Sequence, residues 1–357
     1  MNRLEILYEQ EVKKIAFVVR KVRLEGEKII LKGPRHSGKT YLILDLLSSY
    51  KKEQFLYIDF ADVRIDASIA GDLDAFLKAH LKIELLVLEN LDFAFPLPAC
   101  RRIIITTSQR DFHLKGFHEM TLYPLDFEEF IAFDRKGGDA ETLFSHFANV
   151  GTFPAMLGVS PFAYVQSFQH LIASYYHAPV ELQILKTYAL RQSTLVSVFA
   201  MFNLVKKEHK ISKDKFYAYT HELLNEEVMF MLEKYGQKST QKKLYMIDFA
   251  MRGVLSFEKD FIRRFENMIF LELYKRGESL YYTDWIDFYL PESGSAVLSA
   301  PFMPKERIEK RLEKVKKELA SLEVEHLYIV TMGIQERFMF EGIECEALPF
   351  WNWALQL

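Results

Sequence analysis

Apolar runs alternate with helix-like patterns along the first third of the chain. The runs at residues 55–58, 85–88 and 103–105 carry no polar alternation, which is typical of strands buried on both faces. The segments between them place apolar residues at helical spacing. Residues 25–130 therefore predict an α/β fold in which helices cover both faces of a parallel sheet.

The pattern changes in the remainder of the chain. Residues 136–180 predict mainly helices with a break at 151–154, and residues 181–250 predict helices followed by a short hairpin. That order is typical of a winged helix-turn-helix. The last hundred residues return to α/β, and a highly charged helix there carries one apolar stripe. The stripe consists of Ile308, Leu312, Val315 and Leu319.

Residues 33–40 have the spacing G-x-x-x-x-G-K-[ST] of a phosphate-binding loop. A strand-like run precedes them and a helical pattern follows, as such a loop requires. Glycines let backbone N–H groups reach phosphates, and the helix N-terminus adds its dipole. The predicted nucleotide site comprises Gly33, Pro34, Arg35, His36, Ser37, Gly38, Lys39, Thr40 and Tyr41.

This loop predicts ATP and Mg²⁺ as cofactors. Lys39 would contact the β- and γ-phosphates, and the Thr40 hydroxyl would be a ligand of the metal. The alternative is a glycine-rich turn with an exposed lysine.

Composition limits the remaining functions. A chain of 357 residues, half of them apolar, suggests two or three domains with substantial cores. The net charge of −3 gives no general attraction to nucleic acid, so such binding needs a local patch. Cys100 and Cys345 cannot form a disulfide framework. The uncharged stretch at 192–205 is shorter than a membrane span. We expect a cytoplasmic protein that makes no membrane contact.

Several fragments together resemble one family, the bacterial and archaeal predicted ATPases of the AAA superfamily that carry a C-terminal domain of unknown function. The resemblance extends over nearly the whole chain, and its most specific fragment is 122–130, which reads LYPLDFEEF. The other fragments are Gly33-Pro34-Arg35, Gly151-Thr152-Phe153-Pro154, Lys243 to Asp248, Glu266-Asn267 and Ile286-Asp287-Phe288.

The resemblance implies a fold in several parts. Residues 1–135 would form a P-loop ATPase core and 136–180 a helical lid. Residues 181–250 would form a winged-helix-like module, and 251–357 a degenerate domain similar to restriction endonucleases.

The chain departs from the family at the second ATP motif, an apolar strand that should end in Asp-Glu. Here the strand ends in Glu89-Asn90. Glu89 could hold Mg²⁺ through water, but Asn90 cannot accept a proton, and loss of a general base costs roughly 10²- to 10⁴-fold in rate. Asp92 could substitute, although we expect it to be aimed elsewhere. Glu89 and Asp92 could instead be ordinary solvated carboxylates.

Polar residues after the next strand are candidates for sensing the nucleotide. Thr107 lies in the run Thr106-Thr107-Ser108, where the family has a polar sensor of the γ-phosphate; a hydroxyl-capped strand end is the alternative. Arg101, Arg102 and Arg110 are the nearest candidates for a transition-state arginine, with surface charge as the alternative.

The C-terminal part also departs from the pattern of an active nuclease. Such an enzyme needs an Asp at one strand end and Glu-x-Lys on the next strand. Asp287 is present and Glu266 could support it, but the returning strand at 295–300 has no acid or lysine. We therefore expect a retained scaffold with a structural Asp287 and no DNA cleavage.

The expected winged helix is rich in lysine. Tyr217, Thr220 and His221 are predicted on the exposed side of its recognition helix, after a Ser212 N-cap. DNA is a candidate partner, and a solvated face or a protein-docking module is the alternative. The lysines are Lys206, Lys207, Lys210, Lys213, Lys215, Lys234, Lys238, Lys242 and Lys243.

Together these features predict an ATP-binding protein that acts as a nucleotide-dependent switch, with weak or partner-dependent hydrolysis. The alternative is a DNA-binding winged helix with a vestigial nucleotide site. Another protein or a second copy of the chain remains an open candidate as partner.

Overall fold

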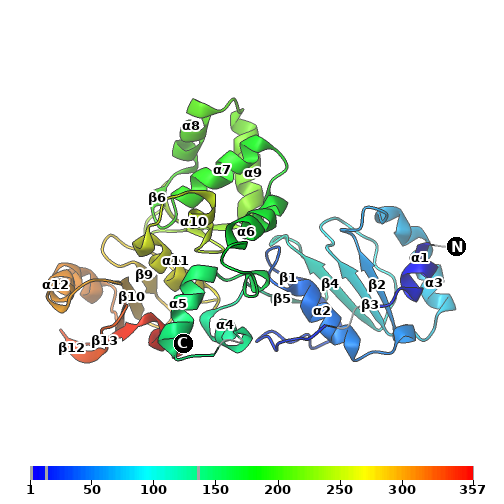
Figure 1. The fold of residues 1–357 in the computed structure, drawn as a ribbon, viewed down its shortest axis with the longest axis horizontal. Coiled ribbons are helices and arrows are strands. Elements are labelled where there is room, and N and C mark those ends of the chain that lie inside the picture. The colour runs from blue at the N-terminus through cyan, green and yellow to red at the C-terminus, as the bar shows by residue number, and fades with distance from the viewer. Residues whose placement is uncertain (1–2, 13–14, 135–136, 357) are drawn as a thin grey trace. The chain divides into compact units, whose positions relative to one another are not determined.

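The computed structural model describes residues 3–12, 15–134 and 137–356, and it divides into two compact units (Figure 1). The first unit is Met1–Pro124 with Asn225–Glu227, and the second is Leu125–Leu224 with Val228–Leu357. The expected domain boundary between residues 135 and 136 lies outside the described residues.

The first unit is an α/β layer structure. Its helices are α1 (Arg3–Glu9), α2 (Lys39–Ser48) and α3 (Ala70–Ala79), with 3-10 turns at Lys52–Gln54 and Ala67–Ile69. Its strands are β1 (Lys28–Lys32), β2 (Phe55–Asp59), β3 (Leu85–Glu89), β4 (Arg102–Thr107) and β5 (His118–Thr121).

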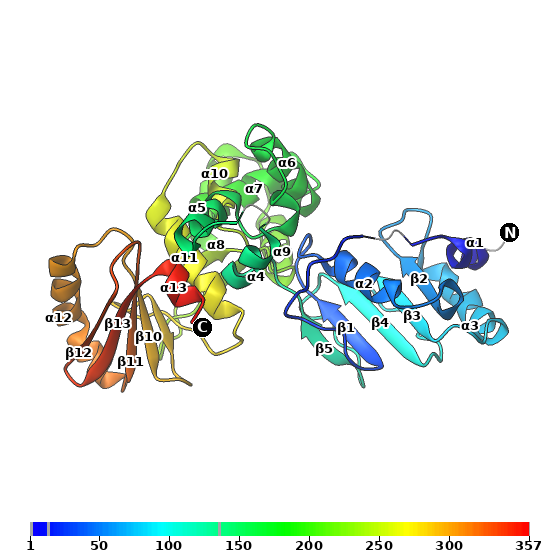
Figure 2. The ribbon, with the colours of Figure 1, turned by 60° about the horizontal axis from the view of Figure 1, so that its bottom comes forward.

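All strands of this sheet are parallel, in the order β2-β3-β4-β1-β5. Side chains alternate between its faces: Ile29 and Ile104 pack with α2, while Ile30 and Ile105 pack with α1 and α3. Figure 2 shows the strands of this sheet side by side, with β1 between β4 and β5. The predicted parallel sheet with helices on both faces is confirmed. The short strand β5 was not predicted, because its two exposed residues followed by two half-buried ones give no apolar run.

The second unit begins with helices. These are α4 (Phe127–Phe133), α5 (Ala140–Val150), α6 (Tyr164–Ile172), α7 (Pro179–Leu190), α8 (Val198–Glu208), α9 (Lys213–Asn225), α10 (Met251–Leu255) and α11 (Phe261–Tyr274), with 3-10 turns at Pro154–Met156 and Ala173–Tyr175. A small sheet of order β6-β8-β7 accompanies them, made of β6 (Leu195–Val196), β7 (Met229–Leu232) and β8 (Lys242–Met246).

The chain ends in a second five-stranded sheet of order β12-β13-β11-β10-β9. The apolar stripe of α12 packs on one face of this sheet, and all four of its predicted residues are buried. The elements are β9 (Phe288–Leu290), β10 (Ser295–Ser299), α12 (Lys305–Ser321), β11 (His326–Thr331), β12 (Glu336–Phe340), β13 (Ile343–Pro349) and α13 (Phe350–Ala354).

Two fragments of the family resemblance meet inside the second unit. Buried Asp248 accepts hydrogen bonds from the Thr152 N–H at 2.6 Å, the Thr152 hydroxyl at 2.8 Å and the Ala250 N–H at 2.7 Å. A Cβ at Gly151, where φ is 87°, would lie 2.5 Å from the same carboxylate. The carboxylate of Asp248 therefore links two segments that lie far apart in the sequence.

The helix α9 has the predicted buried face and N-cap, since the Lys215 N–H donates to Ser212 Oγ at 3.2 Å. Tyr217 and His221 are exposed, as expected. Thr220 is not: it is 3% exposed and hydrogen-bonded to Tyr188 at 3.0 Å, because its position lies on the apolar face. The assignment of these elements to a winged helix stays a prediction.

No helix among the described residues combines the length and apolarity needed to cross a membrane.

Candidate nucleotide site

The loop between β1 and α2 has backbone conformations that its glycines permit. Gly33 has φ 144°, and a Cβ there would lie 2.2 Å from the carbonyl oxygen of Leu122. Gly38 has φ 100° and directly precedes α2. Since non-glycine residues rarely adopt such angles, both glycines of the motif are required by the backbone itself.

Lys39 is folded back onto this loop. Its ammonium group donates to the carbonyl oxygens of Gly33 at 2.7 Å and Pro34 at 2.9 Å, and the side chain is almost fully buried. Burial lowers the pKa of Lys39 to about 8, although the nearby carboxylates of Glu89 and Asp92 oppose this shift. The positive charge needed for phosphate binding is therefore present at neutral pH, but its burial lowers the stability of the folded protein.

Glu89 ends β3 beside Thr40, the first turn of α2. The Thr40 hydroxyl and the Tyr57 hydroxyl each donate a short hydrogen bond to one oxygen of the Glu89 carboxylate. Burial raises the pKa of Glu89, and these two donors partly counteract it. The two predicted metal-site residues, Thr40 and Glu89, are thus in direct contact.

Asn90 is held by hydrogen bonds to Thr106 and Asp59. Its backbone is left-handed, with φ 56°, and its N–H donates to Thr106 Oγ1 at 3.0 Å. The side-chain amide donates to Asp59 Oδ1 at 2.7 Å. An amide fixed in this way carries out no proton transfer, so the geometry offers Asn90 a positioning role at the strand end.

Asp92 lies within the site, although we expected it to be aimed elsewhere. Its carboxylate accepts hydrogen bonds from Thr107 Oγ1 at 2.5 Å and the Ser108 N–H at 3.2 Å, and it also acts on the charge of Lys39. The turn after Asn90 returns the chain towards β4. Thr107, the predicted sensor, is therefore linked to a carboxylate that could accept a proton from water.

Other loop residues have defined contacts. The Arg35 guanidinium donates to Glu226 at 2.9 and 3.1 Å within the first unit. Tyr41 is 58% exposed on α2. Buried Arg20, which the sequence did not single out, donates to the carbonyl oxygen of Ser37 at 2.8 Å.

Two of the candidate arginines lie at the wrong edge of the sheet. Arg101 and Arg102 are at the amino end of β4, and parallel pairing with β1 places that end away from the P-loop. Arg102 donates instead to Leu24 O at 2.6 Å and Tyr50 Oη at 2.9 Å. Arg110 follows the carboxyl end of β4 and is the one of the three on the nucleotide side.

The site has groups that suit a nucleotide and a divalent cation. The hydroxyl oxygen of Ser37 is buried and has no hydrogen-bond partner among the residues that the structure describes, and Lys39 is held by carbonyl oxygens that a phosphate could replace. Thr40 and Glu89 supply the hard oxygen atoms that Mg²⁺ prefers. The residues present therefore fit MgATP: Thr40 and Glu89 would hold Mg²⁺, which would neutralise phosphate charge.

Part of the first unit is similar to a known protein family. Residues 25–92 match the family described as AAA domain. An uncharacterized protein of Methanocaldococcus jannaschii is 27% identical, over 98% of this chain and 94% of that protein. Among solved structures, the Walker-type ATPase PABY2304 of Pyrococcus abyssi is 13% identical with a TM-score of 0.44, over 64% of this chain and 90% of that chain.

The family match is confined to residues 25–92 of the first unit, and it describes that segment as similar to an AAA domain. The matched residues contain the P-loop, Glu89, Asn90 and Asp92, which are the groups described above.

A second charged cluster lies in the other unit, built from fragments of the family resemblance. Lys243 contacts Glu266 at 2.8 Å and Asp287 at 3.4 Å, while Arg311 contacts Asp287 at 2.7 Å. Burial alone would raise the pKa of Asp287, but the two cations outweigh it and lower the pKa. The described residues contain no group of three or more side chains placed to hold a metal ion. The Asp287 carboxylate thus forms ion pairs with Lys243 and Arg311 of the same chain. The positions of these residues in the sequence could not reveal these ion pairs.

Proposed function

We propose that this protein binds MgATP in its AAA-type domain and acts as a nucleotide-dependent switch whose hydrolysis is slow without a partner. The proposal is supported above all by the contact of Thr40 with Glu89 next to an Asn90 that is turned towards Asp59. Binding groups are assembled, whereas the position expected for the base holds an amide.

Slow hydrolysis is consistent with the placement of the remaining acids. The Glu89 carboxylate accepts hydrogen bonds from two hydroxyl groups, and the Asp92 carboxylate accepts one from the Thr107 hydroxyl. Asp92 is the carboxylate best placed to orient water, and a rearrangement that frees it from Thr107 would complete the site. A partner that also supplies an arginine would have the same effect.

Binding is tested by calorimetric titration of the purified protein with MgATP. We expect binding that is lost in Lys39→Ala and retained in Lys82→Ala, an exposed lysine beyond α3 that serves as the matched control. Absence of heat from the wild-type protein, with or without Mg²⁺, would refute the nucleotide site.

Hydrolysis is tested by single-turnover measurements with protein in excess over ATP. We expect slow turnover that Asp92→Asn reduces further and Asn90→Ala leaves within about threefold, since the amide performs no proton transfer. A fast rate in the pure protein, abolished by Lys39→Ala, would overturn the switch and identify an independent ATPase.

DNA binding through a winged helix is the second proposal. It is supported by the confirmed hairpin and by lysines on α8 and α9, but four of the nine lysines contact carboxylates: Lys215, Lys234, Lys242 and Lys243. Duplex binding that falls steeply with salt, is unaffected by ATP and is lost in Lys206→Ala/Lys207→Ala/Lys210→Ala would favour this function over the switch.

A further inference from the structure

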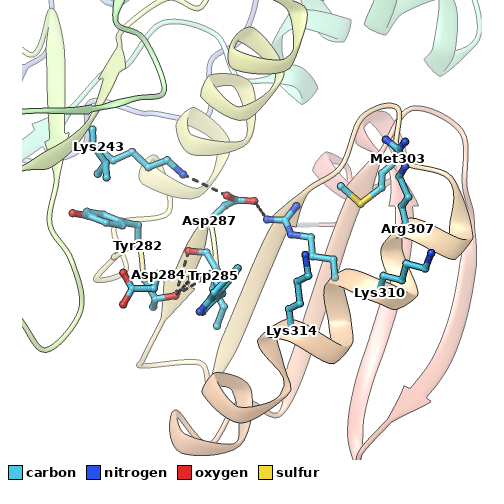
Figure 3. A pocket seen from close by; sticks show the side chains of 13 residues that line it. Lys243, Tyr282, Asp284, Trp285, Asp287, Met303, Arg307, Lys310 and Lys314 are labelled. Carbon is cyan, nitrogen blue, oxygen red and sulfur yellow. Dashed lines mark hydrogen bonds and ion pairs between the residues drawn. The ribbon is translucent and has the colours of Figure 1, made fainter.

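A pocket of about 570 Å³ opens beside α12 in the second unit. Figure 3 shows Asp287 directed towards Lys243, with the side chains of Arg307, Lys310 and Lys314 on α12. Asp287 also forms an ion pair with Arg311. The pocket is lined mainly by cationic and aromatic side chains, which is the composition of a site for an anionic, planar ligand.

The cations of α12 form a row. Arg307, Lys310, Arg311 and Lys314 have the spacing i, i+3, i+4, i+7, which places them on one side of a helix. Arg311 is paired with Asp287, but the other three form no ion pair with any described residue. Three exposed positive charges therefore converge on the pocket without an internal counter-charge.

The carboxylates that line the pocket are already neutralised. Asp284 contacts Lys234 at 2.7 Å, and Asp287 contacts Arg311 at 2.7 Å and Lys243 at 3.4 Å. The acidic side chains of α12 that alternate with its cations, Glu306, Glu309 and Glu313, are not among the residues described as lining the pocket. The residues that line the pocket include five cationic side chains and two carboxylates, so their formal charge is +3.

Trp285 offers a planar surface at the same place. Its side chain is 53% exposed although it lines the pocket. Its backbone N–H donates to Glu318 at 3.2 Å, and the same carboxylate accepts from Thr283 at 2.9 Å. The backbone is anchored while the indole stays accessible, which is the arrangement that favours stacking on a flat partner.

We propose that this pocket binds single-stranded nucleic acid, with Arg307, Lys310 and Lys314 on successive phosphates and Trp285 stacked on a base. Residues 307 to 314 span about 10 Å of helix, and their long, flexible side chains can reach neighbouring phosphates of one strand. Strand-binding proteins combine a cationic groove with aromatic platforms in this way. An acidic peptide would use the cations but not the indole.

The site is separate from the P-loop and from the lysines of α8 and α9, so it does not depend on either function proposed above. No bond is made or broken in it. The ion pairs of Asp287 leave the strand bound and uncut.

The test is fluorescence anisotropy of a fluorescein-labelled 15-mer oligothymidylate with the full-length protein. The variant Arg307→Ala/Lys310→Ala/Lys314→Ala removes three exposed charges from the pocket. Lys305→Ala/Lys316→Ala/Lys317→Ala removes the same charge from α12 outside it. Each phosphate contact of a single strand contributes about −0.7 to the slope of log affinity against log salt concentration. Without three such contacts, the slope of the pocket variant should be less steep by about 2, and its affinity at 0.1 M salt should be about 100-fold lower.

The control variant should retain its affinity within about threefold. Trp285→Ala should weaken binding about 5- to 100-fold, and the oligonucleotide should quench tryptophan fluorescence in the wild-type protein but not in Trp285→Phe. Equal affinity of the two triple variants, or no binding by the wild-type protein, would overturn the proposal. Equal displacement by a glutamate peptide of matched charge would assign the pocket to acidic protein segments instead, and stronger competition by a duplex would overturn its preference for single strands.

Discussion

Replacing Lys39 with methionine should stabilise the nucleotide-free protein while abolishing nucleotide binding. Methionine has a similar length and no charge, and Lys39 is buried against two carbonyl oxygens. The difference between its ordinary pKa of 10.5 and the buried value of about 8 corresponds to about 3 kcal/mol. Because the two carbonyls lose a donor in the variant, we expect a net gain of about 1–3 kcal/mol at pH 7.

The pH dependence separates this cause from a general packing effect. Below pH 8 the lysine is charged in the folded and the unfolded protein, so the full penalty is present. Between pH 8 and 10.5 the folded protein releases the proton while the unfolded chain keeps it, so wild-type stability rises with pH. The advantage of Lys39→Met should therefore shrink by about 2 kcal/mol between pH 7 and pH 9.5.

The assay is scanning calorimetry at both pH values, with Lys82→Met as the exposed control. The unfolding transition whose midpoint temperature MgATP raises in the wild-type protein identifies the first unit. In Lys39→Met, MgATP should leave this midpoint temperature unchanged. A variant that is less stable than the wild type at pH 7, or whose difference from it does not change with pH, would refute the reasoning.

Three further predictions concern other buried groups. Gly33→Ala should destabilise the first unit by about 2–4 kcal/mol, because its Cβ would overlap a backbone carbonyl at a positive φ; Gly71→Ala, with open space in α3, should be neutral or stabilising by calorimetry. Asp248→Ala should destabilise the second unit by about 2–4 kcal/mol in chemical unfolding, since three donors lose their acceptor; an unchanged midpoint would contradict this. Tyr57→Phe should raise the pKa of Glu89 further, because it removes a hydrogen-bond donor to this carboxylate. When titration calorimetry is repeated at decreasing pH, the affinity for MgATP should therefore begin to fall at a higher pH in the variant than in the wild type.

Elements with a strong period could be predicted from the sequence. The strands β2, β3 and β4 are buried runs, and α12 carries its apolar residues at helical spacing, so each was found within one or two residues. The edge strand β12 alternates half-exposed residues with exposed ones, and the neighbouring β13 mixes two glutamates into a buried strand. Neither strand contains a continuous apolar run in its sequence, because the burial of its residues depends on packing against distant segments.

The site was predictable in its residues but not in its geometry. The P-loop spacing fixes which atoms face a phosphate, and those residues follow one another in the chain. The contacts of Glu89 with Tyr57 and of Asp92 with Thr107 join residues that lie 15 or more positions apart in the sequence. Sequence spacing says nothing about such contacts. Asp92 was expected to be aimed elsewhere because a strand or tight turn would direct its side chain away.

The free energy held in the P-loop decides whether ATP can act as a switch. The buried charge of Lys39 costs about 3 kcal/mol without a ligand, and Ser37 contributes a buried hydroxyl without a partner. A ligand at about 100 times its Kd adds about 2.7 kcal/mol to stability, a quantity of the same size. Since a phosphate would relieve both unfavourable groups at once, the loop should change its preferred arrangement between the free and bound protein. A domain that gains this much from binding and hydrolyses slowly can stay in the bound arrangement long enough for a partner to recognise it.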